Sequence, residues 1–373
     1  MTGNPGPGRR VTIADIAERA GVSKGAVSYA LNGQPGVSDA TRERIVALAA
    51  ELGWYPNHAA RSLSASRAHA CGLVIARPSR ILALEPFFME FISGVEAVLS
   101  ANGVALMLQL VTDPLEEVEV YRRWWAERRV DGVMLVDPRV EDPRVVEIAR
   151  LGLPAVIVGS PVEGNAIPAV WHDEAAATAE VVRYLAALGH ERISRVAGVS
   201  DFVHNVSRSD AFRRTADELG LAADVVDTDY TPAAGARATR TLLSRPERPT
   251  AIVYDSDILA VSGLGVAHQM GFAVPDDVSI VGWDDSLICR VVHPPLTAMT
   301  RDIVAYGTAV ATRLLAEVEG AGSGSVQAPP GELTPRGSTG PPVAARRPRA
   351  VGQRGRGGPL PTDPTAGFSP AMG

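Results

Sequence analysis

Residues 11–63 read VTIADIAERAGVSKGAVSYALNGQPGVSDATRERIVALAAELGWYPNHAARSL, and they carry the strongest local folding signals of the chain. Apolar residues recur at helical spacing in this stretch and predict three short helices. Capping residues mark the three helix starts, at Thr12, Ser23 and Ser38, and glycines end the first and third helices. Two short helices joined by a tight turn and braced by a third helix are the parts of a helix-turn-helix.

The second helix of this unit has an apolar stripe that faces inward, which leaves four residues facing outward: Lys24, Gly25, Ser28 and Tyr29. In a helix-turn-helix, the early residues of the second helix face base edges in the major groove of DNA. Residues 1–70 carry only three more basic than acidic residues. So small an excess of positive charge does not distinguish a DNA-binding unit from a three-helix packing domain with no nucleic-acid role.

Four motifs occur in order near the N-terminus, TIADIAERAGVS, AVSYALNG, VSDATRERI and LGWYPNHAARSL. This segment resembles the DNA-binding headpiece of the lactose/galactose repressor (LacI/GalR) family of bacterial transcription regulators. The resemblance implies DNA contacts from seven headpiece residues: Thr12, Ser23, Lys24, Gly25, Ser28, Tyr29 and Asn32. Lys24, Gly25 and Tyr29 fall on its base-reading positions. Members of the family more often carry arginine at the position of Tyr29, and tyrosine lacks the bidentate contact of arginine to guanine. We therefore expect an operator sequence that departs from the usual one.

The segment NHAARSL, residues 57–63, follows the headpiece. The resemblance implies a hinge helix that folds on operator binding and enters the minor groove. Its contacts would come from Asn57, Ala60, Arg61 and Leu63, with Ala60 and Leu63 as an apolar wedge in a base step. A seven-residue helix is too short to be stable alone in water, which agrees with folding on DNA. The alternative is an ordinary interdomain linker.

The composition indicates a globular chain with an acidic body. With 373 residues, of which 46% are hydrophobic, the chain can bury a core in two or three domains. Its net charge of −6 is uneven, because residues 71–320 carry about −13. The sequence shows no membrane-spanning run and no signal peptide, and its two cysteines, Cys71 and Cys289, lie far apart. We therefore expect a cytoplasmic protein with both cysteines in its core.

From Cys71 onward, short apolar runs alternate with helical patterns, which predicts parallel sheets covered on both faces. The resemblance implies a fold in which the all-α headpiece precedes an α/β core like that of periplasmic sugar-binding proteins, with two doubly wound parallel-sheet lobes. The expected domains are the headpiece (1–56), the hinge helix and linker (57–70), the effector-binding and dimerisation core (71–342) and a disordered Pro/Gly/Arg-rich tail (343–373). Residues 321–331, AGSGSVQAPPG, are expected to form a flexible surface loop.

Eight residues of the core are expected to form the effector site. By the resemblance, six of them fall on positions where the family contacts its effector: Phe88, Arg208, Tyr230, Ser256, Asp257 and Asp284. Phe202 and His204, in the loop before Arg208, are expected to line the same pocket and select the ligand. Phe88 and Tyr230 would be aromatic walls for a sugar or flat ring, and Arg208 and Asp284 would be polar anchors. Ser256 stands where the family usually has asparagine, which argues against a typical hexose bound in the typical way. Each residue also has an ordinary structural interpretation, such as a core aromatic, a helix cap, an ion pair or an Asx-turn.

Catalytic patterns are missing from the sequence. It contains no GxSxG, no HExxH and no Cys/His cluster with metal spacing, and its single lysine, Lys24, is not in a P-loop. Gly263-Leu-Gly265 resembles the start of a dinucleotide fingerprint, but it lies in a helical pattern and is interpreted as helix packing. We expect no catalytic site, metal or cofactor.

Together these features predict a homodimeric, cytoplasmic transcription regulator and favour a repressor. It would bind a pseudo-palindromic operator in double-stranded DNA and have no membrane partner. A sugar-like effector bound between the two core lobes would control that binding. Two alternatives belong to other classes. One is the solute-binding protein of a transport system, and the other is an α/β enzyme with a DNA-binding appendage.

Overall fold

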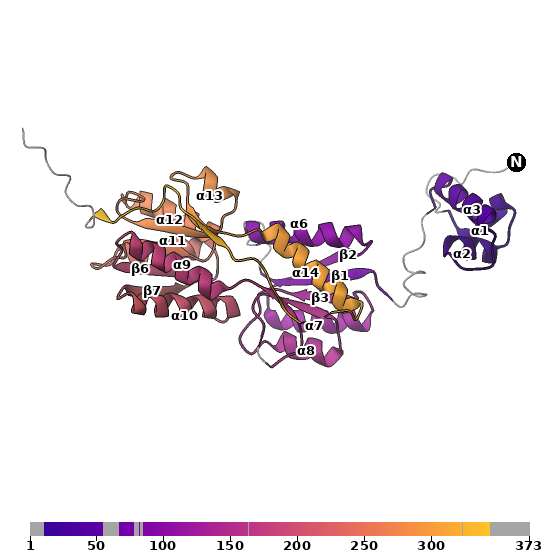
Figure 1. The fold of residues 1–373 in the computed structure, drawn as a ribbon, viewed down its shortest axis with the longest axis horizontal. Coiled ribbons are helices and arrows are strands. Elements are labelled where there is room, and N and C mark those ends of the chain that lie inside the picture. Colours follow the sequence, from indigo (N-terminus) through magenta and orange to yellow (C-terminus); the bar gives the residue numbers. More distant parts are fainter. Residues whose placement is uncertain are drawn as a thin grey trace, which may run out of the picture. The chain divides into compact units, whose positions relative to one another are not determined.

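The computed structural model describes residues 11–54, 67–77, 82, 85–162, 164–322 and 324–343 of the chain. Its N-terminal part contains helices α1 (Ile13–Ala20), α2 (Lys24–Leu31) and α3 (Asp39–Glu51) (Figure 1). Their shared core contains fully buried Ile16, Val27 and Ile45. The predicted three-helix headpiece is therefore confirmed.

Two of the three predicted caps form at the headpiece helix starts, whereas Ser38 occupies the N-cap position of α3 without a capping hydrogen bond from its side chain. The Thr12 hydroxyl accepts a hydrogen bond from the Asp15 backbone N–H, and an Asp15 carboxylate oxygen accepts one from the Thr12 backbone at 2.7 Å. Gly21 ends α1 with a φ of 65°, a conformation that costs glycine little and lets the chain turn into α2. The Ser23 hydroxyl then caps α2 by accepting from the Ala26 N–H at 3.1 Å.

The chain divides into two units, each with one six-stranded sheet. Unit 1 consists mainly of residues 88–171 and 303–328, and also takes in residues 1–83. Its sheet has the strand order β11-β5-β4-β3-β1-β2, and all of its paired strands run parallel. The elements are β1 (Ala70–Ala76), α6 (Pro86–Ala101), β2 (Ala105–Val111), α7 (Pro114–Ala126), β3 (Gly132–Leu135), α8 (Pro143–Leu151), β4 (Ala155–Val158), β5 (Ala169–Trp171), α14 (Ile303–Val318) and β11 (Val326–Gln327).

Two glycines allow the late helix α14 to pack tightly against α6 within unit 1. A Cβ on Gly94 would lie 2.0 Å from the carbonyl oxygen of Val304, and a Cβ on Gly307 would lie 2.2 Å from that of Phe91. The two helix backbones therefore touch without intervening side chains. This close contact fixes residues 303–318 to a unit in which strands β1 to β5 all lie more than 130 residues earlier in the chain.

Unit 2 contains residues 84–87, 172–302 and 329–373. Its sheet has the order β12-β10-β9-β8-β6-β7, and only β12 runs antiparallel, against β10. The elements are α9 (Glu174–Ala187), β6 (Arg192–Ala197), α10 (Val203–Glu218), β7 (Ala222–Asp227), α11 (Pro232–Leu243), β8 (Ala251–Tyr254), α12 (Asp257–Gln269), β9 (Ser279–Asp284), α13 (Leu287–Val291), β10 (Thr297–Thr300) and β12 (Glu332–Thr334).

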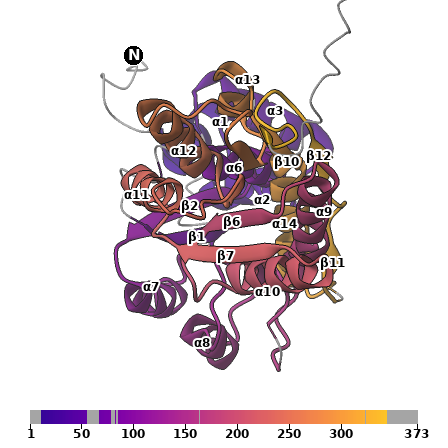
Figure 2. The same cartoon turned by 90° about the vertical axis from the view of Figure 1, so that its left-hand side faces the viewer.

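Helices cover both faces of the unit 2 sheet. Helices α9 and α10 lie on one side of β6 and β7, and α11 and α12 lie on the other (Figure 2). Side chains alternate between the two faces along a strand, so Ile252 and Tyr254 of β8 belong to one core cluster and Val253 to the other. The predicted pair of doubly wound parallel sheets is confirmed, and both predicted core cysteines are buried thiols.

The flexible loop expected over residues 321–331 is wrong in its central part. Val326 and Gln327 form strand β11, which pairs in parallel with Val170 and Trp171 at the edge of the unit 1 sheet. The Ala328 N–H also donates to the Trp171 carbonyl at 2.7 Å. The short polar sequence is ordered because its backbone groups complete an existing sheet, a contact that local composition does not encode.

Most of the tail expected to be disordered, residues 343–373, lies outside the described residues. Where the model describes the chain, no helix is both long and apolar enough to cross a membrane.

Candidate DNA-binding and effector sites

The outer face of α2 is polar and accessible. Lys24 and Gly25 are exposed at its first turn, and Tyr29 is 47% exposed one turn later. Val27 and Ala30 of the same helix are buried in the headpiece core. The side chains predicted to face bases and those predicted to face the core therefore lie on opposite sides of one short helix.

The other described residues of the predicted DNA interface also have structural roles. Thr12 and Ser23 cap α1 and α2, and the Asn32 amide donates to the Ser28 hydroxyl at 3.3 Å. Capping occupies one lone pair of each hydroxyl and leaves a second for a phosphate-bridging water. The four predicted hinge contacts, Asn57, Ala60, Arg61 and Leu63, lie outside the described residues.

Seven of the eight predicted effector residues follow the carboxyl ends of parallel strands in unit 2. Phe202, His204 and Arg208 come after β6, Tyr230 after β7, Ser256 and Asp257 after β8, and Asp284 ends β9. In sheets of this type, ligands bind outside the carboxyl ends of the strands. Phe88 belongs to unit 1, where it is buried in α6 with the Arg77 guanidinium 5.4 Å from its ring centre.

Three of these residues form one aromatic group. Tyr230, in the left-handed region with a φ of 63°, stacks with Phe202 at a ring distance of 6.4 Å, and its hydroxyl lies 3.0 Å from His204 Nε2. A Cβ on Gly198 would lie 1.8 Å from the Tyr230 ring, so the hydroxyl end of the ring packs directly against the backbone at Gly198. Asn205, which the sequence did not single out, donates from its side-chain amide to the Tyr230 hydroxyl at 3.1 Å.

Arg208 and Asp284 belong to a second, charged group. The Arg208 Nε donates to a Glu174 oxygen at 2.7 Å, and its guanidinium lies 4.4 Å from the ring centre of Trp283. Arg301 donates to the other Glu174 oxygen at 2.7 Å and also pairs with Asp284. Arg301 thus links Arg208 and Asp284, the two predicted polar anchors, through the Glu174 carboxylate, which the sequence analysis did not single out.

A further buried ion pair, between Arg195 and Asp255, contacts this charged group. Arg195 donates two hydrogen bonds to the Asp255 carboxylate, at 2.7 and 2.6 Å, and both side chains are fully buried. Asp255 also accepts from the Gly198 N–H at 3.0 Å and lies 3.8 Å from the Arg208 guanidinium. This pair therefore couples the charged group to the backbone that packs against the Tyr230 ring.

Glu174 and Arg208 are both charged near neutral pH. Burial raises the pKa of the Glu174 carboxyl, but the positive charges of Arg208 and Arg301 outweigh it and hold that pKa well below its usual range. Burial likewise lowers the pKa of Arg208, yet Glu174 and Asp255 raise it above its usual value. The arrangement is a buried network of full charges, in which each guanidinium is held by carboxylates.

Ser256 and Asp257 have their polar atoms engaged inside unit 2. The Ser256 hydroxyl caps α12 by accepting from the Leu259 N–H at 3.3 Å. The Asp257 carboxylate accepts from the backbone N–H groups of Trp283 and Ser286 at 2.9 and 2.8 Å. Burial, together with the nearby charge of Asp284, raises the pKa of Asp257 to about 6. Asp257 thus positions the loop that carries Asp284, whereas Ser256 serves as the cap of α12, and a direct effector contact of either residue stays a prediction.

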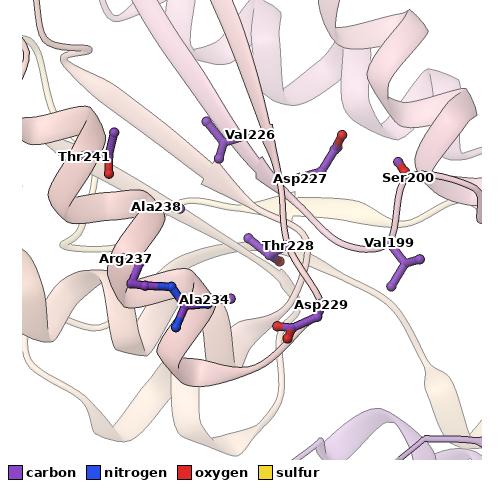
Figure 3. Close-up of a pocket in the computed structure, with 10 residues that line it drawn as sticks. All are labelled: Val199, Ser200, Val226, Asp227, Thr228, Asp229, Ala234, Arg237, Ala238 and Thr241. Atoms are coloured by element: carbon purple, nitrogen blue, oxygen red, sulfur yellow. The ribbon is translucent and has the colours of Figure 1, made fainter. Parts of the chain in front are cut away.

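A pocket of about 690 Å³ with mixed polar and apolar walls lies at the β7 edge of the unit 2 sheet (Figure 3). Its walls come from the loop after β6, the end of β7 and helix α11, and its charged residues are Asp227, Asp229 and Arg237. None of the eight predicted effector residues lines it. The described residues contain no group of three or more His, Cys, Asp or Glu side chains placed to hold a metal ion.

Sequence reasoning missed Glu174, Arg301, Asp255 and Asn205 for different reasons. Asp255 directly follows a buried strand, a position at which ligand-binding residues of parallel sheets gather. Its place in the sequence could therefore have singled it out. Glu174 and Arg301 are 127 residues apart, and each alone resembles an ordinary surface charge. Only the fold brings them together.

Comparison with known proteins identifies the family. Residues 12–57 match the model of bacterial regulatory proteins of the lacI family, and residues 182–339 match a periplasmic binding protein-like domain. The HTH-type transcriptional regulator CelR of Thermobifida fusca is 32% identical over 317 residues, which cover 84% of this chain and 93% of CelR.

Two solved structures extend the comparison. A transcriptional regulator CelR–cellobiose complex is 30% identical with a TM-score of 0.67, covering 88% of this chain and all of that one. The lac repressor dimer bound to operator and the anti-inducer ONPF is 26% identical with a TM-score of 0.77, covering 89% of this chain and all of that one. The chain belongs to the lacI family of bacterial regulatory proteins.

Proposed function

We propose that this protein represses transcription by binding a pseudo-palindromic operator as a homodimer, and that a sugar-like effector bound in unit 2 controls this binding. The observation that carries the proposal is the combination of an exposed polar face on α2 with a polar and aromatic group at the carboxyl ends of the unit 2 strands. One element is suited to reading DNA and the other to holding a small molecule. The relatives are DNA-binding transcription regulators rather than enzymes.

Dimerisation is proposed on physical grounds. One helix in one major groove buries little surface, and a second half-site raises affinity through effective concentration. The lac repressor relative is described as a dimer bound to operator, which supports the same arrangement here. A regulator of this kind acts in the cytoplasm, where the chromosome is.

A sugar-like effector is supported by the chemistry of unit 2. Tyr230 and Phe202, both buried in unit 2, are aromatic side chains of the kind that stack on sugar rings, and Arg208 and Asp284 are charged groups of the kind that hydrogen-bond sugar hydroxyls. The CelR relative is described as a complex with cellobiose. The coupling between effector and operator has to be only ~1–3 kcal/mol to change DNA occupancy five- to 150-fold.

The first test is a thermal-shift screen of the full chain against sugars, sugar phosphates, nucleosides and purines. A ligand present at a hundred times its Kd stabilises the protein by ~2.7 kcal/mol. Each hit is then added to the protein bound to operator DNA selected from a random library. A ligand that both raises Tm and changes operator affinity supports the function, whereas hits that leave operator affinity unchanged argue against effector control.

The solute-binding protein of a transport system is the alternative that the comparisons do not favour. It leaves the headpiece without a role, although this segment matches the lacI family model. Ligand binding without any sequence-specific DNA binding would support that alternative instead.

A further inference from the structure

Two buried arginines lie at the carboxyl ends of the unit 2 strands. Arg208 is 4% exposed, and the side chain of Arg301 is 7% exposed. Guanidinium groups bind carboxylates and phosphates through paired hydrogen bonds, and two of them in one place usually indicate an anionic ligand. Taken alone, these arginines therefore suggest a sugar phosphate or a sugar acid as effector.

Glu174 changes that expectation because it already holds both arginines. One of its carboxylate oxygens accepts from Arg208 at 2.7 Å, and the other accepts from Arg301 at 2.7 Å. Asp284 accepts from the remaining side of Arg301. The carboxylate that an anionic ligand would bring is thus supplied by the chain itself.

The position of Glu174 in the fold keeps this carboxylate in place. It is the first residue of α9, and the preceding Asp173 caps that helix by accepting from the Ala176 N–H at 2.8 Å. The positive end of the helix dipole favours a negative charge there. The Glu174 side chain is itself about 10% exposed, so it cannot exchange its arginine partners for water.

Counted over these ion pairs, positive and negative groups are equal in number without a ligand, and the nearby Asp257 carboxyl adds no further cation. Three arginines, Arg195, Arg208 and Arg301, face three carboxylates, those of Glu174, Asp255 and Asp284. A further anion would add an unpaired charge in a region with little water, which is costly. A neutral hydroxyl can instead donate to a carboxylate lone pair and accept from a guanidinium N–H without changing the balance.

We propose that Glu174 determines the charge of the effector, so that the site accepts a neutral polyhydroxylated ligand and rejects its phosphorylated or carboxylated forms. This inference extends the proposed effector site and depends on it. Glu174 acts in it as a specificity-determining residue, because it occupies the two cations that would otherwise bind an anion.

The test measures binding of matched neutral and anionic sugars to the full chain by titration calorimetry. The pairs are cellobiose with cellobionate, maltose with maltobionate, and glucose with glucose 6-phosphate. For the wild type we expect a neutral member to bind and its anionic partner to bind at least ~10-fold more weakly, because the anion lacks a free cation. For Glu174→Gln we expect this ratio to fall at least ~10-fold or to reverse, because the two arginines then carry one uncompensated positive charge.

Two further variants separate selectivity from general damage. Glu117→Gln removes an even more deeply buried carboxylate, which pairs with Arg144 at 2.8 Å in unit 1, and is expected to keep the wild-type ratio. The double variant E174Q/R301Q restores equal numbers of positive and negative groups and is expected to return the ratio toward the wild-type value. A purely structural role for Glu174 would lower affinity for neutral and anionic members alike.

Several results would overturn the assignment. The first is an anionic sugar that binds the wild type more tightly than its neutral partner. The second is a neutral-to-anionic affinity ratio that is the same in Glu174→Gln as in the wild type. The third is that no neutral sugar binds the wild type and no anionic sugar binds the variant. If Glu174→Gln does not fold, the wild-type ratio alone decides. Failure of the regulatory function looks different, because the expected selectivity would then occur with no effect of the bound sugar on operator binding.

Discussion

Two glycines of α12 make a sharp test of how unit 2 is packed, because they are two residues apart and have opposite surroundings. A Cβ on Gly263 would lie 2.1 Å from the Tyr254 hydroxyl oxygen and 2.4 Å from the adjoining ring carbon. A Cβ on Gly265 would meet nothing within 4 Å. The same substitution, glycine to alanine, is therefore expected to change the free energy of unfolding in opposite directions.

The expected magnitudes follow from these contacts. Tyr254 is fully buried, and its hydroxyl lies 2.7 Å from the Thr239 hydroxyl, so the ring cannot move into solvent. Overpacking costs ~1–3 kcal/mol, and loss of the hydroxyl hydrogen bond adds ~0.5–1.5 kcal/mol. Gly263→Ala should thus destabilise unit 2 by ~2–4 kcal/mol. Gly265→Ala should stabilise it by ~0.5–1 kcal/mol, because alanine loses less backbone entropy in a helix.

Differential scanning calorimetry of the full chain measures both effects on the transition that includes unit 2. A change of 1 kcal/mol shifts Tm by ~2–4 °C for a unit of this size. Gly263→Ala is therefore expected to lower Tm by ~4–16 °C and Gly265→Ala to raise it by ~1–4 °C. Circular dichroism at low temperature checks that both variants keep the native helix content.

The packing interpretation fails if Gly263→Ala is as stable as the wild type, or if the two variants shift Tm in the same direction. The first result would mean that Tyr254 is not held where the structure places it. The second would mean that helix propensity alone governs this helix, and that Gly263 has no part in packing α12 onto the sheet.

Three further predictions concern DNA binding and pH. Lys24→Ala removes an exposed cation at the start of α2, so it should weaken operator binding and reduce the salt dependence of the binding constant. Fluorescence anisotropy over a salt series measures both quantities. If neither the Kd nor its dependence on salt concentration changes, Lys24 is not in the DNA interface. Leu63→Ala should lower operator affinity with effector binding intact, and unchanged operator affinity would rule out the minor-groove wedge. His190 is buried beside the Thr250 hydroxyl at 2.8 Å, and burial lowers its pKa to about 4. Its neutral form is therefore required in the fold, and its contribution to stability is complete above pH 6.5 and lost as the pH falls toward 4. Between pH 7 and pH 5, His190→Asn should lose ~2 kcal/mol less stability than the wild type in urea unfolding; parallel pH profiles would contradict this.

The headpiece was predictable from sequence because its signals are local. The hydroxyl of Ser23 caps the helix that begins at the next residue, and Gly21 turns the chain only one residue after α1 ends. Both signals act within a few residues, and the apolar spacing of each helix specifies its buried face. The same holds for strands such as β8, a short apolar run between turns that lies in the middle of a sheet.

The long-range arrangement was not predictable in the same way. Nothing near residues 303–328 indicates that they return to unit 1, where Gly307 packs on α6 and Val326 extends the sheet. The flexible loop expected there was wrong because a partner strand 156 residues earlier orders it. Periodicity reports which face of an element is buried, but it does not report which element covers that face.

The candidate effector site was predicted only in part for a related reason. The family resemblance placed Arg208, Tyr230 and Asp284 on effector positions, and the structure puts Arg208 in α10, Tyr230 in the loop after β7 and Asp284 at the end of β9. A motif comparison does not single out the carboxylate of Glu174 or the guanidinium of Arg301, because these groups belong to the candidate site only through their ion pair across 127 residues. Charge balance in a buried group is a property of the fold and not of any motif.

The central claim is that this chain is a sequence-specific DNA-binding regulator controlled by a small molecule. The most direct measurement is the affinity of the full chain for an operator selected from a random duplex library, with and without the sugar that raises Tm most. We predict enrichment of an inverted repeat with two half-sites, and a change of at least ~5-fold in Kd when the sugar is present. Selection of no common sequence, or an operator Kd that is the same with and without the sugar, would contradict the claim.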